Sequence, residues 1–238
     1  MLPLAGKPVI AHVIERCAAI TGIETVCIAT TILHRDDVVA ETAESLGAVV
    51  FRGSEDDVLD RYAQAARMLD ADVVLRVTCD DPVLDPFLCA AVLRARVDEE
   101  ADFATNNLPP SWPYGLDCEV FTREWLERSD REAKTAHERE HVGPYVRNSA
   151  EARRVNVRSA MFLNHHRLTL DTEEDRAFLE MLFERIPIAP ELWDHRRLIA
   201  AMETDPELLA ASTAPDRAGV FLAPSREPSG TIQIVVEE

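Results

Sequence analysis

The chain has 238 residues and a formal net charge of −18, with 47% apolar and 29% charged residues. This composition is typical of a soluble globular protein of one domain, or of one domain with a small additional lobe. So acidic a surface would repel a nucleic acid unless the few cations clustered, and the sequence contains no basic stripe. The charge therefore argues against nucleic acid as a partner.

The cysteines and the N-terminal residues point to a cellular compartment. Five cysteines, spread along the chain without a CxxC pair, disfavour a disulfide framework and a zinc site. The stretch MLPLAGKPVIAHVI contains a lysine and two prolines, and no apolar run approaches the length of a membrane span. We expect neither a signal peptide nor a membrane span, and a reducing cytoplasm as the simplest location.

The first third of the chain alternates helical and strand patterns. Pro8 stands at the favoured first position of an amphipathic helix, and Gly47 ends the next helix. Ser54 and Asp57 form a capping-box pattern that opens a third helix. The patterns predict helices over 8–19, 36–46 and 54–69, and strands over 25–30, 48–52 and 73–78.

The rest of the chain adds shorter elements. LPPSWPYG reads as a loop, and HEREHVGPYVRN as a helix that bends at Pro144. The alternation predicts an α/β fold with three layers, right-handed crossovers and a largely parallel sheet. We expect one domain over 1–211, followed by a linker and a strand-like tail over 212–238. Further helices are predicted over 86–97, 122–129, 173–185, 193–204 and 206–211, and strands over 102–107, 117–121, 154–159 and 167–171.

Acidic residues follow the central strand. In VVLRVTCDDPVLDP, the apolar run ends at Thr78 and is followed by Asp80 and Asp81, while Asp85 precedes a proline as a helix cap. Ligands of open parallel sheets bind at the carboxyl ends of strands, where two carboxylates suit Mg²⁺ bound to phosphate. The alternative is that these acids are ordinary turn and capping residues.

Longer stretches carry a family resemblance. In order, PLAGKPVIAHVIER, FRGSEDDVLDRYAQAA, LRVTCDDPVLDP, NNLPPSWPYGLDCEVF, HEREHVGPYV and RLTLDTEEDRAFL resemble the cytidylyltransferases of the spore coat polysaccharide biosynthesis protein F type. More distantly they resemble the sialic acid and Kdo activating enzymes. The resemblance implies a Rossmann-like nucleotide-diphospho-sugar transferase fold. It also implies an enzyme that joins the α-phosphate of CTP to a sugar or sugar acid and releases pyrophosphate in surface polysaccharide biosynthesis.

The resemblance assigns the metal-binding carboxylates to Asp80 and Asp171. A divalent cation between them, expected to be Mg²⁺, would offset the charge that develops on the phosphate. Asp171 also fits the start of a helix, where an acid stabilises the first turn. We expect Arg76 either to reach phosphate or to pair with an acid.

Other residues match family positions that bind substrates. The 106–117 loop is expected to orient the acceptor sugar, with loop scaffolding as the alternative role, and the EREH segment is placed near the acceptor or else is a solvated helix. The candidates for substrate binding are Asn106, Asn107, Tyr114, Gly115, Asp117, Glu138 and His141, and those for nucleotide binding are Lys7 and Thr78.

One departure from the family concerns the start of the sequence. Family members begin with a strand and a loop rich in glycine, serine and arginine that holds the triphosphate, whereas this sequence starts after that element. The first alternative to an active enzyme is therefore a non-catalytic homologue or partner subunit that binds a sugar nucleotide, and a glycosyltransferase is another. We also expect a homodimer, with Trp112, Tyr114 and Trp125 as exposed interface aromatics or as a lid.

The tail gives a final expectation. A sheet without its first strand exposes the pairing edges of that strand's neighbours. TIQIVV, residues 231–236, is the unassigned strand-like run. We expect it to pair with the main sheet, either in that position or along an edge.

Overall fold

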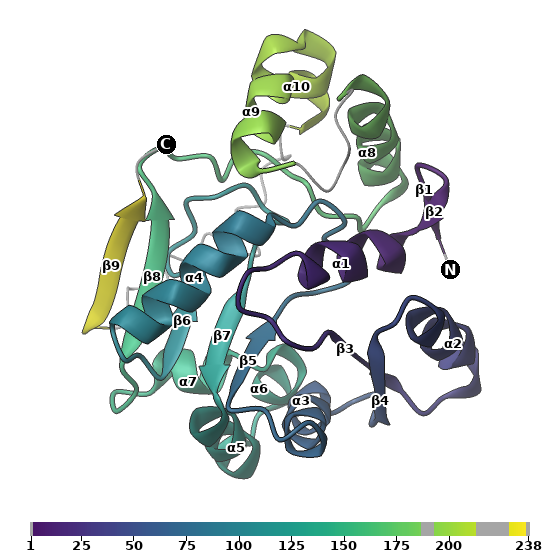
Figure 1. The fold of residues 1–238 in the computed structure, drawn as a ribbon. Helices are drawn as coiled ribbons and strands as arrows, with labels where there is room; N and C mark the ends of the chain where they lie inside the picture. Colours follow the sequence, from purple (N-terminus) through teal and green to yellow (C-terminus); the bar gives the residue numbers. More distant parts are fainter. Residues whose placement is uncertain (1, 187–192, 213–228, 237–238) are drawn as a thin grey trace.

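The computed structural model describes residues 2–186, 193–212 and 229–236. Helices lie on both sides of a set of strands, which confirms the predicted Rossmann-like α/β class (Figure 1). The helices are α1 Val9–Ala18, α2 Asp37–Ser45, α3 Val58–Met68, α4 Pro86–Asp98, α5 Arg123–Glu132, α6 Ala136–His141, α7 Pro144–Asn148, α8 Glu173–Arg185, α9 His195–Thr204 and α10 Pro206–Ser212, and a 3₁₀ turn, η1, spans His34–Asp36. The strands are β1 Pro3–Leu4, β2 Lys7–Pro8, β3 Cys27–Thr31, β4 Val49–Gly53, β5 Val73–Arg76, β6 Phe103–Thr105, β7 Glu119–Thr122, β8 Arg154–Ser159 and β9 Thr231–Val236.

The described strands form one five-stranded sheet and two separate pairs. The large sheet has the order β5-β7-β6-β8-β9, β3 pairs with β4, and β1 pairs with β2 as a hairpin. The pairs β3–β4, β6–β8 and β8–β9 are parallel, whereas β7 runs antiparallel to both β5 and β6. Since β5 and β6 both oppose β7, they run in the same direction as β8 and β9, so the sheet is largely parallel, as expected, with β7 as an antiparallel strand inside it.

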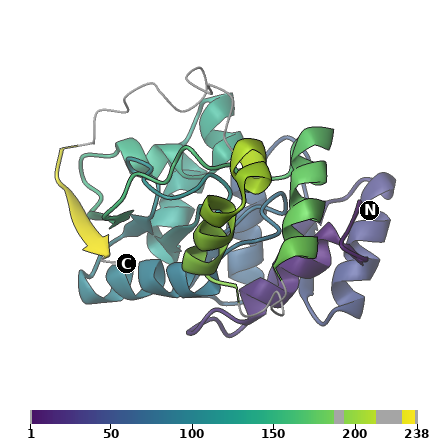
Figure 2. The ribbon, with the colours of Figure 1, turned by 90° about the horizontal axis from the view of Figure 1, so that it is seen from above.

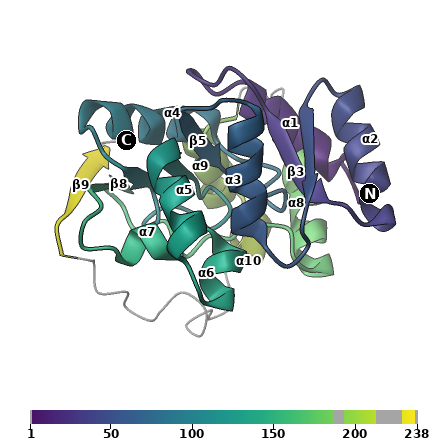
Figure 3. The same cartoon turned by 90° about the horizontal axis from the view of Figure 1, so that it is seen from below.

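Two apolar clusters cover the two faces of the large sheet. Successive strand residues point to opposite faces, so Ala104 and Val120 belong to the cluster with α4, while Phe103 and Phe121 belong to the cluster with α3 and α5. Figure 3 shows α1 and α4 on one side and α5, α6 and α7 on the other. The expected three layers are present.

Three helices from the later part of the chain group at one end of the fold. α8 and the α9–α10 hairpin lie side by side in Figures 1 and 2, and Leu179, Leu198 and Leu208 join them to the same core as α4. Asp85, the cap of α4, accepts hydrogen bonds from the backbone N–H of His195 at 2.9 Å and from its own helix. The cap of one helix therefore fixes the start of another.

The tail pairs with the sheet as predicted, along an edge. β9 lies parallel to β8 over Thr231–Val236 at the end of the sheet (Figure 1). Asn156 of β8 donates a side-chain hydrogen bond to Gln233 of β9 at 2.9 Å, which helps to set the register. Residues 213–228 of the expected linker lie outside the described residues.

Two expectations about the loop side of the sheet were wrong. Residues 167–171 form no regular strand and make only an isolated bridge between Arg167 and Tyr114, because their neighbour is a turning loop rather than a strand. Trp112 and Trp125 are 2% and 6% exposed, so they are core residues and not surface aromatics. The Trp112 indole N–H donates to the Val157 carbonyl at 2.8 Å, which satisfies its polar atom inside the core.

Candidate active site

The acids after β5 lie against the segment that carries Asp171. The Asp80 carbonyl accepts hydrogen bonds from the Leu170 N–H at 2.8 Å and from the Thr169 hydroxyl at 3.2 Å. Asp171 follows Leu170 directly, so the structure brings the two predicted metal ligands to one place. The Thr78 hydroxyl donates to Asp81 Oδ2 at 3.1 Å, which ties the neighbouring acid to the end of the strand.

The carboxyl groups at this end of β5 influence one another. Burial, followed by the nearby Asp80 and Asp117, raises the pKa of Asp81 well above its usual range. Burial also raises the pKa of Asp171; Arg167 opposes this increase and Asp80 adds to it. Several acids therefore share a region where their negative charges repel one another, and a bound cation would relieve that repulsion.

Arg167 and the start of α8 hold Asp171 in position. Arg167 Nη2 donates to Asp171 Oδ2 at 2.8 Å, and the same buried guanidinium forms an ion pair with Asp175. The Asp175 carboxylate accepts the Asp171 and Thr172 N–H groups, each at 2.9 Å, in a capping box at the start of α8. The predicted capping role therefore belongs to Thr172 and Asp175, while the Asp171 side chain remains 45% exposed.

These carboxylates suit Mg²⁺. The described residues contain no group of three or more histidine, cysteine or acidic side chains that would hold a metal alone. Magnesium commonly binds one or two carboxylates and takes its other ligands from water and substrate phosphates. Asp80 and the partly exposed Asp171 provide such an incomplete oxygen set.

The 106–117 loop is fastened to the same segment. Asn106 is buried, its Nδ2 donates to the Leu116 carbonyl at 2.8 Å, and its Oδ1 accepts the Cys118 N–H at 2.9 Å. Both ends of this side chain therefore support the loop, which is the scaffolding role. The Tyr114 backbone pairs with residues 166 and 168, and Arg167 Cζ lies 5.6 Å from the Tyr114 ring centre.

Gly115 makes this contact possible. Its φ is +104°, and a Cβ at this position would lie 2.6 Å from the Thr169 nitrogen and 2.7 Å from the Leu168 carbonyl carbon. A side chain would force the two backbones apart. Gly115 therefore lets the loop approach residues 168 and 169 closely.

Asp117 follows this turn and has an unusual acidity. Burial raises its pKa to about 6, although Arg147, the Asn107 side chain and the Gly115 N–H all stabilise the carboxylate. Asn107 Oδ1 also accepts from the Thr105 hydroxyl at 2.9 Å. Asp117 and Asn107 are thus polar loop residues near the strand-end acids.

Arg76 pairs with an acid, one of its two expected roles, in an ion-pair network whose other members no sequence pattern marked. Its Nη1 lies 2.9 Å from Oε2 of Glu119, and Arg147 Nε lies 3.1 Å from Oε1 of the same carboxylate. Glu119 is 5% exposed and is shared by both guanidinium groups. Its partners are 43 and 28 positions away in the sequence, so only the fold shows the network.

Three predicted binding residues have other partners. Lys7 pairs with Glu15 at 2.8 Å, and both side chains are about half exposed. Glu138 accepts the Thr135 N–H in the capping box of α6, and His141 is exposed with its ring 4.5 Å from that of His137. These contacts are those of helix surfaces and helix caps.

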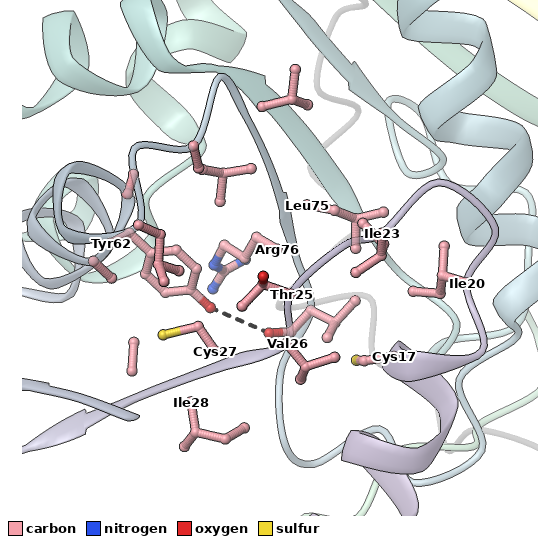
Figure 4. Close-up of a pocket in the computed structure, with 18 of the residues that line it drawn as sticks. Cys17, Ile20, Ile23, Thr25, Val26, Cys27, Ile28, Tyr62, Leu75 and Arg76 are labelled. Atoms are coloured by element: carbon pink, nitrogen blue, oxygen red, sulfur yellow. Dashed lines mark hydrogen bonds between the residues drawn. The ribbon is translucent and has the colours of Figure 1, made fainter. Parts of the chain in front are cut away.

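A cavity of about 610 Å³ opens beside the end of β5, and Arg76, Thr78 and Cys79 line that side of it. From there it extends between β3 and β5, where Figure 4 shows Tyr62, Cys27 and Leu75 around the space.

Within the described residues, none of the helices is both long enough and apolar enough to span a bilayer.

Comparisons with known proteins identify the family of the chain. The cytidylyltransferase family model matches residues 1–199. The chain is 31% identical to the uncharacterized protein MJ1063 of Methanocaldococcus jannaschii (87% and 85% of the two chains) and 30% identical to spore coat polysaccharide biosynthesis protein SpsF of Bacillus subtilis (77% of each). A cytidylyltransferase structure from Leptospira borgpetersenii superposes with a TM-score of 0.84 at 28% identity and covers 90% of each chain. The chain therefore belongs to the cytidylyltransferase family.

Proposed function

We propose that the chain transfers the cytidylyl group of CTP to a hydroxyl of a sugar or sugar acid in surface polysaccharide biosynthesis. The acceptor oxygen bonds to the α-phosphorus, the bond to the β-phosphate breaks, pyrophosphate leaves, and the hydroxyl proton passes to solvent. The family match supports a nucleotidyltransferase, and the name of the Bacillus subtilis relative supports the polysaccharide role. The observation that carries the proposal is the 2.8 Å hydrogen bond that joins the Asp80 and Asp171 segments.

The roles of the residues follow from their positions. Asp80 and Asp171 would hold Mg²⁺, which when bound supplies positive charge to phosphate oxygens. Arg167 fixes the Asp171 carboxylate, since it bonds to Asp171 and Asp175 together. The loop with Asn107, Tyr114 and Asp117 lies at the same strand end and would orient the acceptor, whereas Asn106 and Gly115 hold that loop in shape.

Pyrophosphate release from CTP tests the proposal. The purified chain is incubated with MgCl₂, CTP and a panel of sugars and sugar acids that includes Kdo and sialic acid. Asp80→Asn and Asp171→Asn should each lower the rate by roughly 100-fold or more, because the charge of a catalytic metal contributes several kcal/mol. Glu173→Gln is the matched control, since this acid is 83% exposed two positions from Asp171. Turnover that is equal in Asp80→Asn and the unchanged chain would overturn the metal assignment.

Nucleotide binding distinguishes the proposed enzyme from a non-catalytic homologue. Calorimetry with CTP and CMP is run on the same sample. Binding without pyrophosphate release from any acceptor would favour the sugar-nucleotide-binding homologue, and no binding of either nucleotide would contradict both. Transfer of a sugar from a nucleotide donor, seen as a mass increase of the acceptor, would instead indicate a glycosyltransferase.

The proposal extends to assembly and location. We propose a cytoplasmic homodimer, although its interface cannot be the buried pair Trp112 and Trp125. Light scattering over micromolar concentrations measures the mass in solution against a chain mass of 26.6 kDa. A constant monomer mass would remove the dimer from the proposal.

A further inference from the structure

The last strand, β9, makes side-chain contacts with the loop beside the candidate site. β9 lies next to β8 (Figure 1), where Gln233 is paired with Asn156 across the parallel ladder. The two side chains lie on one face of the sheet, opposite to Val155 and Ile232, which pack into the cluster with α4. On their own face, the two amide groups meet the start of the 106–117 loop.

The backbone of Leu108 is bonded on both sides by these two amides. Its N–H donates to Asn156 Oδ1 at 2.9 Å, and its carbonyl accepts from Gln233 Nε2 at 3.2 Å. Asn156 Nδ2 donates to the Pro109 carbonyl at 3.2 Å, and proline has no N–H of its own. Every backbone donor and acceptor of Leu108 and Pro109 therefore has a side-chain partner on β8 or β9.

The two amides also bond to each other, which fixes their orientation. Asn156 Nδ2 donates to Gln233 Oε1 at 2.9 Å. Because the Leu108 N–H requires an oxygen and the Leu108 carbonyl requires a nitrogen, one orientation of each amide satisfies all four bonds of this Leu108 network. Asn156 is fully buried, so an unpaired polar group in the network would be costly.

The chemistry of the network requires glutamine at position 233. Its side chain accepts from Asn156 through one atom and donates to the Leu108 carbonyl through another. An ionised glutamate of the same length could accept from Asn156, but it would place a second oxygen against the Leu108 carbonyl. Methionine has a similar length and no donor, and lysine has no acceptor.

The Leu108 network adjoins a residue that was expected to bind substrate. Asn107 directly precedes Leu108, and its Oδ1 accepts from the Thr105 hydroxyl at 2.9 Å. The Asn107 side chain also hydrogen-bonds to Asp117, and its backbone forms an isolated bridge with Pro110. The turn over 107–110 is therefore held by β6 at its start and by β8 and β9 at its centre.

We propose that Gln233 is a positioning residue for the acceptor: together with Asn156 it holds the Leu108 backbone and so places Asn107 and Asp117 against the sugar. The inference rests on the proposed function, which makes this loop the acceptor site. The hydrogen bonds of the Gln233 side chain lead to β8 and to the loop rather than to the acids that would hold Mg²⁺. Substitution of Gln233 should therefore change the affinity for the sugar and leave that for CTP unchanged.

Hydrogen exchange measured by NMR tests the Leu108 network without any substrate. Gln233→Met removes both side-chain bonds with little change of size, and the Leu108 amide should then exchange roughly tenfold or more faster. Ile234→Val shortens a side chain on the opposite face of the same strand, so it is the matched control for lost stability and should leave Leu108 unchanged. Equal exchange of Leu108 in the two variants would overturn the proposal.

Initial rates of pyrophosphate release test the role in acceptor binding. The reactions contain MgCl₂, CTP and whichever of Kdo and sialic acid reacts faster with the unsubstituted chain. Gln233→Met should raise the KM for that sugar roughly tenfold and leave the KM for CTP unchanged, and Gln233→Glu should do at least as much. Ile234→Val should change neither. An unchanged sugar KM, or an equal rise of both KM values, would overturn the proposal.

A pair of substitutions tests the route through the loop. Asn107→Ala removes a side chain that Gln233 is proposed to place, so Gln233→Met should raise the sugar KM much less in that background than in the unsubstituted chain. Fully additive effects would contradict the proposal. If the unsubstituted chain releases no pyrophosphate with either sugar, the proposed function fails, and the exchange of Leu108 alone decides whether Gln233 positions the loop.

Discussion

A Cβ atom on Gly143 would lie 2.2 Å from Oε1 of Glu119. The loop between α6 and α7 therefore touches the carboxylate that joins Arg76 to Arg147. Gly143 has φ −69°, which any residue adopts, so the requirement for glycine is steric rather than conformational. The close contact couples the stability of this loop to the ion-pair network beside the cavity.

Gly143→Ala should destabilise the chain by about 1–3 kcal/mol, the usual effect of overpacking, because Glu119 must move away from both arginines. The free energy of unfolding is measured in urea. The same change is then made in a Glu119→Ala chain, where the added methyl group meets no carboxylate and should cost much less. An equal effect of Gly143→Ala in the two backgrounds would show that contact with Glu119 is not the cause.

Gly115→Ala should disturb the site as well as the fold. The added Cβ would overlap the backbone at Leu168 and Thr169, and φ is +104°. Gly47→Ala is the matched control, with φ +83° and no atom within 4 Å of its Cβ. In the control, the left-handed backbone should lower the free energy of unfolding by about 1–2 kcal/mol. Gly115→Ala should lower it further and should also weaken binding of Mg²⁺–CTP. Unchanged nucleotide affinity in a folded Gly115→Ala chain would contradict the link between this loop and Asp171.

Asp117 should make stability depend on pH. Burial raises its pKa to about 6 in the folded chain, compared with about 3.9 in an unfolded chain. Between these two pH values the Asp117 carboxyl group is protonated in the folded chain and ionised in the unfolded chain. The free energy of unfolding therefore falls as the pH rises from about 4 to about 6. Asp117→Asn removes the free-energy cost of ionising this buried carboxyl group. The substitution should therefore stabilise the chain more at pH 8 than at pH 4, by about 1–2 kcal/mol after allowance for partial exposure.

Urea unfolding at the two pH values measures that difference. The exposed Asp98 of α4 provides the control, and Asp98→Asn should show the same small effect at both. A pH-independent effect of Asp117→Asn would mean that its carboxyl group titrates normally.

The two faces of β9 should respond differently to substitution. Ile234 packs against the core cluster that includes α4, whereas Val235 is 56% exposed. Ile234→Ser should lower the free energy of unfolding by about 1–2 kcal/mol through lost apolar burial. Val235→Ser should change it by about 0.5 kcal/mol or less. Thermal melting of both variants checks the assignment, and equal melting temperatures would show that β9 does not dock as described.

The elements that the sequence predicted well are those with strong local signals. α1, α3 and α8 follow apolar periodicity and capping residues, and β9 was identified from its apolar run and expected to pair with the main sheet, either in the position of the first strand or along an edge. The direction of β7 was not predictable in this way, because an alternating pattern is the same for either direction of pairing. The residues of 167–171 read as a strand for the same reason, although their neighbour in the fold is a loop.

In the candidate site, too, some residues gave a signal in the sequence and others depend on the fold. Asp80 was marked by its place after a strand, and the family resemblance paired it with Asp171; the structure places their segments in contact. Glu119, Arg147 and Arg167 gave no signal, because their roles depend on partners distant in sequence or on burial. The side chains of Trp112 and Trp125 looked like surface aromatics because sequence alone does not show which face of a loop or helix is covered.

The position of β9 in the chain determines when the outer edge of β8 is paired during synthesis. Its partner, β8, begins at Arg154, and the paired residue Thr231 lies 77 positions later. At a synthesis rate of about 5–20 residues per second, the outer edge of β8 waits roughly 4–15 s on the ribosome for its partner. During that interval the apolar Val155 and Val157 lie on a strand with one open edge. Until β9 emerges, a nascent chain is therefore open to mispairing with a neighbouring copy at the edge of β8.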